Sequence, residues 1–178
     1  MRAVVYSAAP VVHLYQNGTL VGTAAAGKEN RFTAIFEISY QPGVLEAVSV
    51  FDGKEISRSR LETTGDPAAI RVRGERASVA ADGHSLIYVT AELVDEDGRV
   101  VADQDRLLTA SVSGAADLTA FGSANPITEE NYTEGRFTSW RGRVQAILRA
   151  GEEAGEAVLT ISADGLDSVS LRVLVQEK

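Results

Sequence analysis

Adjacent carboxylates occur twice in the sequence, at Glu129-Glu130 and at Glu152-Glu153. Two carboxylates can hydrolyse a glycosidic bond with retention when they lie about 5 to 5.5 Å apart across a cleft, one of them with a pKa raised by burial. Neighbouring residues in polar segments rich in Gly and Asn do not give that arrangement, and such charges are usually solvated loop residues. We therefore expect no catalytic residue in this chain.

Candidate metal ligands are few and poorly spaced. His13 and His84 lie far apart in the sequence, and neither stands at a metal-ligand spacing. The run Asp95-Glu96-Asp97-Gly98 resembles the start of a calcium loop, but the spaced oxygen ligands and the terminal bidentate glutamate are missing, so a charged hairpin turn explains it. The chain has no cysteine, no phosphate-binding loop and no nucleophile elbow. We expect no metal and no cofactor.

The aromatic residues Tyr132, Phe137 and Trp140 form the one aromatic cluster of the sequence. Exposed aromatic rings can stack on a sugar ring, and the same residue types anchor contacts between domains. Arginines flank the single tryptophan, and their aliphatic stems can cover apolar surface. The three residues are therefore candidate contacts to a sugar or to another domain, with packing favoured, and we expect Trp140 to be at least half buried.

Composition restricts the partners of the chain. The 178 residues include 44% hydrophobic and 24% charged residues, which is typical of a globular protein. A net charge of −8 repels phosphate backbones and anionic lipid headgroups, so neither nucleic acid nor a membrane is an expected partner. No apolar run is long enough to span a bilayer, and the N-terminus lacks a signal-peptide pattern, which predicts a soluble chain.

The elements that must position these residues are strands. Apolar residues alternate with a period of two, as in Ile87, Val89, Ala91 and Leu93, whereas helical periodicity is nearly absent. Short turn signals of the Asn-Gly and Asp-Gly type separate the runs. Many short strands with regular turns predict an all-β chain of two tandem β-sandwich domains of immunoglobulin-like type.

A domain boundary is expected near residues 63–67, where turn formers and a proline interrupt the alternation. Residues 1–65 would form a small sandwich and residues 66–178 an immunoglobulin-like one. The strands expected in the first part cover residues 3–7, 11–16, 19–22, 31–38, 44–51 and 55–61. Residues 123–139, rich in Asn, Glu, Thr and Gly, are expected to form a long loop in the second part.

Several motifs resemble the domains that follow the catalytic barrel in family 2 glycoside hydrolases. Residues 12–18 (VHLYQNG), followed by Gly22, resemble the VELFLNGxxxG hairpin of a small post-barrel domain, with His13 and Gln16 departing from the usual acidic and apolar residues. Residues 40–47 (YQPGVLEA) are similar to the YEPGxLxAV segment of that domain, and residues 64–70 (TGDPAAI) to the joint that follows it. Their order along the chain also matches the family.

The second part resembles the terminal immunoglobulin-like domain of the same family. Residues 81–83 (ADG), 88–95 (YVTAELVD) and 97–98 (DG) resemble its opening strands. Residues 121–126 (FGSANP) are similar to its GxGxxxP loop and residues 142–149 (GRVQAILR) to its GRAxAIxR strand. Nothing in the chain resembles the surroundings of the family's catalytic glutamates, which lie in the barrel.

The resemblance implies a non-catalytic C-terminal scaffold segment of a bacterial, β-galactosidase-like enzyme that packs beside the barrel or shapes its entrance. Its partners would be the other domains of that retaining enzyme, and carbohydrate is an open second partner. The compartment would be the bacterial cytoplasm or, if the parent enzyme is exported, outside it. Two alternatives remain: a carbohydrate-binding module, and an immunoglobulin-like spacer of a surface protein.

Overall fold

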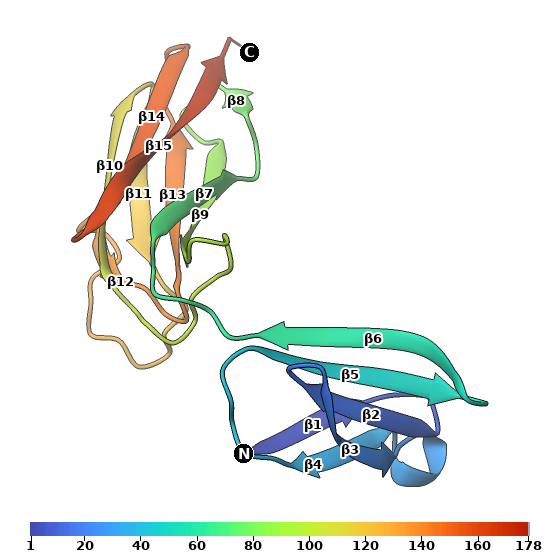
Figure 1. The fold of residues 1–178 in the computed structure, drawn as a ribbon. Helices are drawn as coiled ribbons and strands as arrows, with labels where there is room; N and C mark the ends of the chain where they lie inside the picture. Colours follow the sequence, from blue (N-terminus) through green and yellow to red (C-terminus); the bar gives the residue numbers. More distant parts are fainter. Residues whose placement is uncertain (178) are drawn as a thin grey trace. The chain divides into compact units, whose positions relative to one another are not determined.

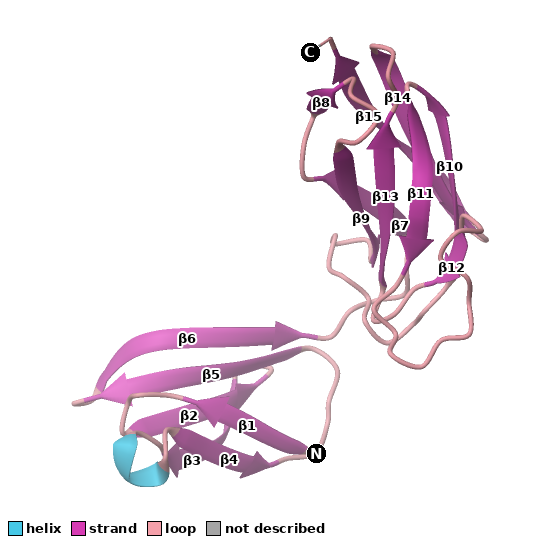
Figure 2. Cartoon of the chain, turned by 180° about the vertical axis from the view of Figure 1, so that it is seen from behind, coloured by secondary structure: helices cyan, strands magenta, loops and turns pink. Residues whose placement is uncertain are grey.

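The computed structural model describes residues 1–177 and confirms the all-β prediction of two β-sandwich, immunoglobulin-like domains (Figures 1 and 2). The chain divides into two compact units, residues 1–63 and the residues from Thr64 onward. Among the described residues, no helix is long and apolar enough to cross a membrane.

The first unit contains six strands and one short 3-10 helix, η1 (Lys28–Asn30). Its strands are β1 (Arg2–Tyr6), β2 (Val11–Gln16), β3 (Thr19–Ala25), β4 (Thr33–Glu37), β5 (Val44–Phe51) and β6 (Lys54–Glu62). Four of them form a sheet in the order β3-β2-β5-β6, and β1 pairs with β4 in a second sheet (Figure 1). The strand expected at 31–38 begins only at Thr33, because Arg31 and Phe32 adopt left-handed backbone conformations with φ of 53° and 60°.

A small core lies between the two sheets of the first unit. Its fully buried residues are Val12, Leu14, Ala26, Ala34 and Phe36. The ring of Phe36 packs so closely on Gly22 that a Cβ there would lie 2.8 Å from the ring, which explains why this position of the hairpin motif is glycine. Gln16, where an apolar residue is usual, is also buried, and its Nε2 donates to the carbonyl of Ser39 at 3.1 Å.

The second unit is a larger sandwich of nine strands. They are β7 (Ala69–Gly74), β8 (Ser78–Ala80), β9 (Leu86–Val94), β10 (Leu107–Gly114), β11 (Ala116–Gly122), β12 (Arg136–Thr138), β13 (Arg143–Ala150), β14 (Gly155–Ala163) and β15 (Leu166–Gln176). One sheet has the order β12-β10-β14-β15-β8 and the other β11-β13-β9-β7 (Figure 2). The segment expected to be one long loop, residues 123–139, contains the short strand β12, because residues 136–138 pair with β10.

The core of the second unit follows the alternation read from the sequence. The predicted inward residues Ile87, Val89, Ala91 and Leu93 on β9 are all buried, as are the inward residues of β13. The aromatic rings of Phe121 and Phe137 are fully buried in the same core. The opposite face of the β11-β13-β9-β7 sheet is therefore left to polar and partly exposed side chains.

Candidate functional site

A hollow of about 450 Å³ lies on the outer face of the second unit, over strands β11, β13 and β9. Gly122, Gln145 and Thr90 are register partners across these strands and form one row of its floor. The full lining consists of Thr90, Ala120, Gly122, Ser123, Ala124, Tyr132, Trp140, Arg141, Arg143, Val144, Gln145 and Ile147. Two of the three aromatic residues singled out from the sequence therefore face the same space.

One wall of the hollow is a tight turn at residues 140–143. Trp140 and Arg143 exchange backbone hydrogen bonds of 3.0 and 3.2 Å, and Arg141 and Gly142 between them have φ of 52° and 70°. Positive φ at both central residues is the geometry of a two-residue hairpin turn, and glycine adopts it without steric cost. The turn places the guanidinium carbon of Arg141 4.8 Å from the centre of the Trp140 ring, which is a cation–π contact.

Asp105 anchors this turn from the preceding loop. Its Oδ1 accepts hydrogen bonds from the Gly142 amide and from the Ser139 hydroxyl, both at 3.0 Å. The buried Ser139 hydroxyl in turn accepts a bond from the Arg106 amide at 3.0 Å. The position of Trp140 is thus fixed by polar contacts that lie outside the hollow itself.

Tyr132 forms another part of the wall. Its ring packs on Phe137, with ring centres 4.7 Å apart, and lies directly over Gly122, where a Cβ would be 2.2 Å from the tyrosine ring. The Phe121 amide donates to the Tyr132 carbonyl at 2.7 Å, which fixes this loop to β11. Glycine at position 122 is therefore required for the tyrosine to close the hollow.

The polar groups of the hollow are basic or neutral. Its lining includes Arg141 and Arg143 and no Asp or Glu. Arg143 donates through Nε to Oε1 of Glu92 at 3.0 Å, and Glu92 Oε2 accepts from Arg71 at 2.7 Å. Burial raises the pKa of Glu92, but the bonds from Arg71 and Arg143 outweigh burial and hold that pKa below its ordinary value. Glu92 is thus an ionised structural partner shared by two arginines.

The three candidate aromatic residues have different surroundings. Trp140 is only partly exposed, which confirms the expectation that at least half of it is buried. Phe137 has no exposed surface, so it supports Tyr132 from below, whereas Tyr132 is 44% exposed. Because Tyr132 packs on Phe137 and Arg141 stacks on Trp140, the described residues of the hollow form no open pair of coplanar rings. The sequence already showed arginines flanking Trp140, whereas the Asp105 anchor carried no signal there.

The paired carboxylates have structural or solvated surroundings. Glu130 is partly buried rather than solvated, because its Oε1 accepts from the amide and hydroxyl of Thr138 at 2.8 and 2.9 Å. Glu129 points to solvent beside it, and Glu152 and Glu153 are both exposed. These surroundings do not set two carboxylates across a cleft as retaining hydrolysis needs.

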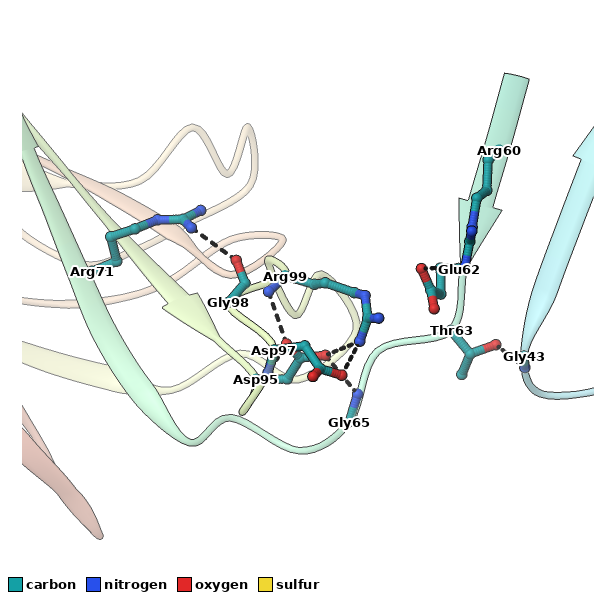
Figure 3. Close-up of polar contacts among 10 residues, drawn as sticks. All are labelled: Gly43, Arg60, Glu62, Thr63, Gly65, Arg71, Asp95, Asp97, Gly98 and Arg99. Carbon is teal, nitrogen blue, oxygen red and sulfur yellow. Dashed lines mark hydrogen bonds and ion pairs between the residues drawn. The ribbon is translucent and has the colours of Figure 1, made fainter. Parts of the chain in front are cut away.

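The acidic run at 95–98 is a turn closed by backbone hydrogen bonds of 2.9 Å, from the Asp95 amide to the Arg99 carbonyl and from the Gly98 amide to the Asp95 carbonyl. Figure 3 shows the side chain of Asp95 at this turn. Asp95 is 4% exposed, and its carboxylate accepts hydrogen bonds from the amides of Asp97, Arg99 and Gly65 at 2.8 to 3.1 Å. Burial raises the pKa of Asp95, whereas these amide bonds and the nearby Arg99 lower it. The lowering effects together outweigh burial, so the pKa lies below its ordinary value. The carboxylate oxygens are occupied by the protein itself.

The histidines lie in different units. His13 Nδ1 contacts the Thr23 hydroxyl at 2.8 Å on the neighbouring strand, whereas His84 is exposed on a loop of the other unit. Within the described residues, no group of three or more His, Asp or Glu side chains is placed to hold a metal ion.

The first unit carries a different surface, an apolar face on the β1–β4 sheet. Val4, Tyr6 and Ile35 are 43%, 79% and 46% exposed, and Val4 and Ile35 are register partners on the face opposite the core. Beside it, a groove of about 440 Å³ is lined by residues 1–6 and by the side chains of Leu14, Leu45 and Leu61. Within the described residues β1 pairs only with β4, so its other edge borders this groove.

The fold defines a pair of all-β sandwich domains. Residues 70–172 match the family described as glycoside hydrolase family 2 C-terminal domain 5, and residues 1–57 match a domain of unknown function, DUF4982. The chain belongs to the glycoside hydrolase family 2 C-terminal domain 5 family.

The relatives are much longer enzymes. The chain is 27% identical to the β-galactosidase BoGH2A of Bacteroides ovatus, covering 97% of this chain and 20% of that enzyme. It is 25% identical to a protein of Formosa agariphila named as a putative β-glucuronidase, and the match covers 89% of this chain and 16% of that protein. A crystal structure of a family 2 glycosyl hydrolase from Bacteroides cellulosilyticus matches with a TM-score of 0.94 and 30% identity, covering 99% of this chain and 23% of that chain. The chain thus spans about a fifth of the length of the curated β-galactosidase it matches.

Proposed function

We propose that this chain is a non-catalytic accessory segment of a retaining β-glycosidase and that it docks onto the other domains of that enzyme. The match to about a fifth of a β-galactosidase and the family membership support this proposal. Residues 1–65 would be the small post-barrel domain and residues 66–178 the terminal immunoglobulin-like domain. The parent enzyme would act on β-galactosides or related β-glycosides.

The observation that carries the proposal is the apolar face of the β1–β4 sheet. Clustered exposed apolar residues on a soluble domain commonly mark a surface that another protein surface covers. Val4 and Ile35 lie side by side there, with Tyr6 two residues further along the same face of β1. A docking contact would remove these side chains from water and stabilise both partners.

The two alternatives have less support. A carbohydrate-binding module that relies on a platform of coplanar aromatic rings needs faces open to solvent, whereas Arg141 stacks on Trp140 and Tyr132 packs on Phe137. A spacer of a surface protein would not be expected to match a family 2 glycoside hydrolase structure along 99% of its length.

Enzymatic assay of the isolated chain tests the non-catalytic part of the proposal. We expect no turnover of nitrophenyl β-galactoside or nitrophenyl β-glucuronide, because the acidic pairs lack the geometry for retention. Turnover that copurifies with the chain and disappears in a Glu129→Gln or Glu130→Gln variant would overturn it.

The docking part is tested by Val4→Lys and Ile35→Lys, made in the isolated chain and in the complete enzyme. Both side chains are about half exposed, so the isolated chain should keep its melting temperature. The complete enzyme should melt at a lower temperature, because a lysine at a covered apolar contact buries an unpaired charge. Ile56→Lys is the matched control, since Ile56 is 57% exposed on β6. Equal melting temperatures for all three variants of the complete enzyme would contradict docking through this face.

A further inference from the structure

The hollow of the second unit has a charge opposite to that of the chain. The whole chain carries a net charge of −8, yet the hollow is lined by two arginines and by no acidic side chain. Of the two, Arg143 is held by Glu92. An anionic group that enters the hollow would therefore meet a local positive charge supplied mainly by Arg141.

Arg141 is prepared for such a group. Its guanidinium stacks over the Trp140 ring and makes no hydrogen bond or ion pair with any described residue. This contact restrains the guanidinium at the hollow, so less freedom of the side chain is lost when an anion binds to its five N–H donors. Guanidinium groups pair with planar carboxylates and with sulfates through two parallel hydrogen bonds.

The remaining lining suits a pyranose ring. Tyr132 and Trp140 supply apolar parts of the lining, and the volume of about 450 Å³ is within the range of small-ligand sites. The Oγ of Ser123 is buried and has no hydrogen-bond partner among the described residues, and the side-chain amide of Gln145 makes no hydrogen bond with them either. A buried hydroxyl without a partner is unfavourable, and a sugar hydroxyl would satisfy it.

We infer that this hollow binds an acidic sugar residue, a pyranose that carries a carboxylate or a sulfate ester. Arg141 pairs with the anionic group, Tyr132 and Trp140 contribute apolar contacts to the ring, and Ser123 and Gln145 exchange hydrogen bonds with its hydroxyls. The site would hold an acidic polysaccharide near the catalytic part of the enzyme. The hollow belongs to the second unit and the proposed docking face to the first. Failure of the sugar-binding proposal would therefore not contradict the docking proposal, and the reverse also holds.

Nuclear magnetic resonance tests the site on the 178-residue chain. Because Trp140 is the only tryptophan, its indole N–H gives one resolved signal. We expect trigalacturonate or a sulfated galactobiose to shift this signal saturably at millimolar concentration, while neutral galactotriose does not. Arg141→Gln should lower the affinity for the anionic sugar by about five- to tenfold, because one charge-assisted pair is lost.

Arg149→Gln is the matched control, because it removes the same charge from an exposed residue of β13, the strand that follows the turn, and Arg149 lies outside the hollow. Its affinity should equal that of the unaltered chain. A shift by only one of the two anionic sugars identifies whether carboxylate or sulfate is preferred and supports the site. Three results would each overturn it: no saturable shift by either anionic sugar, equal binding of the neutral sugar, or equal weakening by Arg149→Gln. An unchanged amide spectrum of each variant shows that it is folded.

Discussion

Asn17 links the motif at residues 12–18 to the motif at residues 40–47, and Pro42, one of its partners, lies 25 residues further along the chain. It occupies the hairpin turn between β2 and β3 with φ of 50°, and its side chain reaches the segment that leads into β5. Its Oδ1 accepts from the Val44 amide at 2.7 Å, and its Nδ2 donates to the Pro42 carbonyl at 3.0 Å. The side chain also fills the space that a Cβ on Gly43 would need.

We predict that Asn17→Ala destabilises the first unit by about 1 to 2 kcal/mol more than Asp52→Ala, because two hydrogen bonds of ordinary strength are lost. Asp52 is the matched control: it has the same left-handed conformation in the β5–β6 turn, with φ of 49°, and its side chain bonds to no described residue. Hydrogen exchange of residues 1–63 in the full chain measures the difference. Equal protection in the two variants would show that these bonds contribute nothing.

Asp82 is a second residue whose environment has a measurable effect. Its Oδ1 accepts from the amides of Ser85 and His84 at 2.7 and 2.9 Å, and its Oδ2 accepts from the Ser85 hydroxyl at 2.9 Å. These bonds lower the pKa of Asp82 from 3.8 to about 2, and the bond from the Ser85 amide has the largest effect. The pKa of Asp82 is lower in the folded than in the unfolded state, so its ionised form stabilises the fold. This contribution is fully present at pH values above the unfolded-state pKa and is lost as the pH falls through the folded-state pKa.

Asp82→Asn should therefore reduce the free energy of unfolding of the second unit at neutral pH, and the difference from the unaltered chain should shrink between about pH 4 and pH 2. Urea unfolding followed by Trp140 fluorescence provides the measurement. Asp117→Asn is the control, since Asp117 is exposed on β11 and accepts no hydrogen bond from the described residues. A pH-independent difference for Asp82→Asn would contradict the linkage.

At the scale of elements, the turn at 140–143 depends on one glycine. Gly142 has φ of 70°, and a Cβ there would lie 2.1 Å from the carbonyl oxygen of Val101. Its amide donates to Asp105 and its carbonyl accepts from the Leu93 amide at 2.8 Å. The turn thus lies between β9 and the segment around Val101. Moving Gly142 away from Val101 would break its hydrogen bonds to Leu93 and Asp105.

Gly142→Ala should lower the free energy of unfolding of the second unit by about 3 kcal/mol or more. An alanine is strained at this positive φ, and its Cβ would also clash with the Val101 carbonyl oxygen. Gly165→Ala is the control: Gly165 has a similar φ of 76° in the β14–β15 turn, with open space around it, and should cost about 1 kcal/mol. Thermal unfolding of both variants tests this. The larger loss should also change the Trp140 fluorescence, which a uniform destabilisation would not do.

At the scale of the whole molecule, the two units differ in the size of their cores. Five apolar residues form the fully buried core of the first unit, whereas twenty form that of the second. A domain of about 60 residues buries only about 60% of its unfolded surface, and this chain has no cysteine to compensate. The first unit also keeps Val4, Tyr6 and Ile35 in water.

We predict that a fragment of residues 1–65 is disordered or aggregates, whereas a fragment of residues 66–178 folds cooperatively. Separate expression and thermal melts of the two fragments are the measurement, with the full chain as reference. A sharp transition of the first fragment at high temperature would show that its small core suffices.

The sequence alone was enough to predict most strands of the first unit and the buried faces of β9 and β13. Period-two alternation on β9 fixed which side chains face the core, because successive side chains of a strand point to opposite sides of the sheet. The Asn17-Gly18 and Asp97-Gly98 dipeptides marked turns for the same local reason, since few residues tolerate positive φ. The aromatic cluster at 132–140 was also visible in the sequence as a place of interest.

Only the tertiary structure decided what that cluster does. Phe137 and Tyr132 lie five residues apart, yet one is in the core and the other at the rim of a hollow, because β12 pairs with β10 while the preceding loop crosses Gly122. Arg141 stacks on Trp140 because Asp105, 36 residues earlier, holds the turn. Contacts between residues distant in sequence depend on how the sheets pack, and local residue preferences carry no information about that packing.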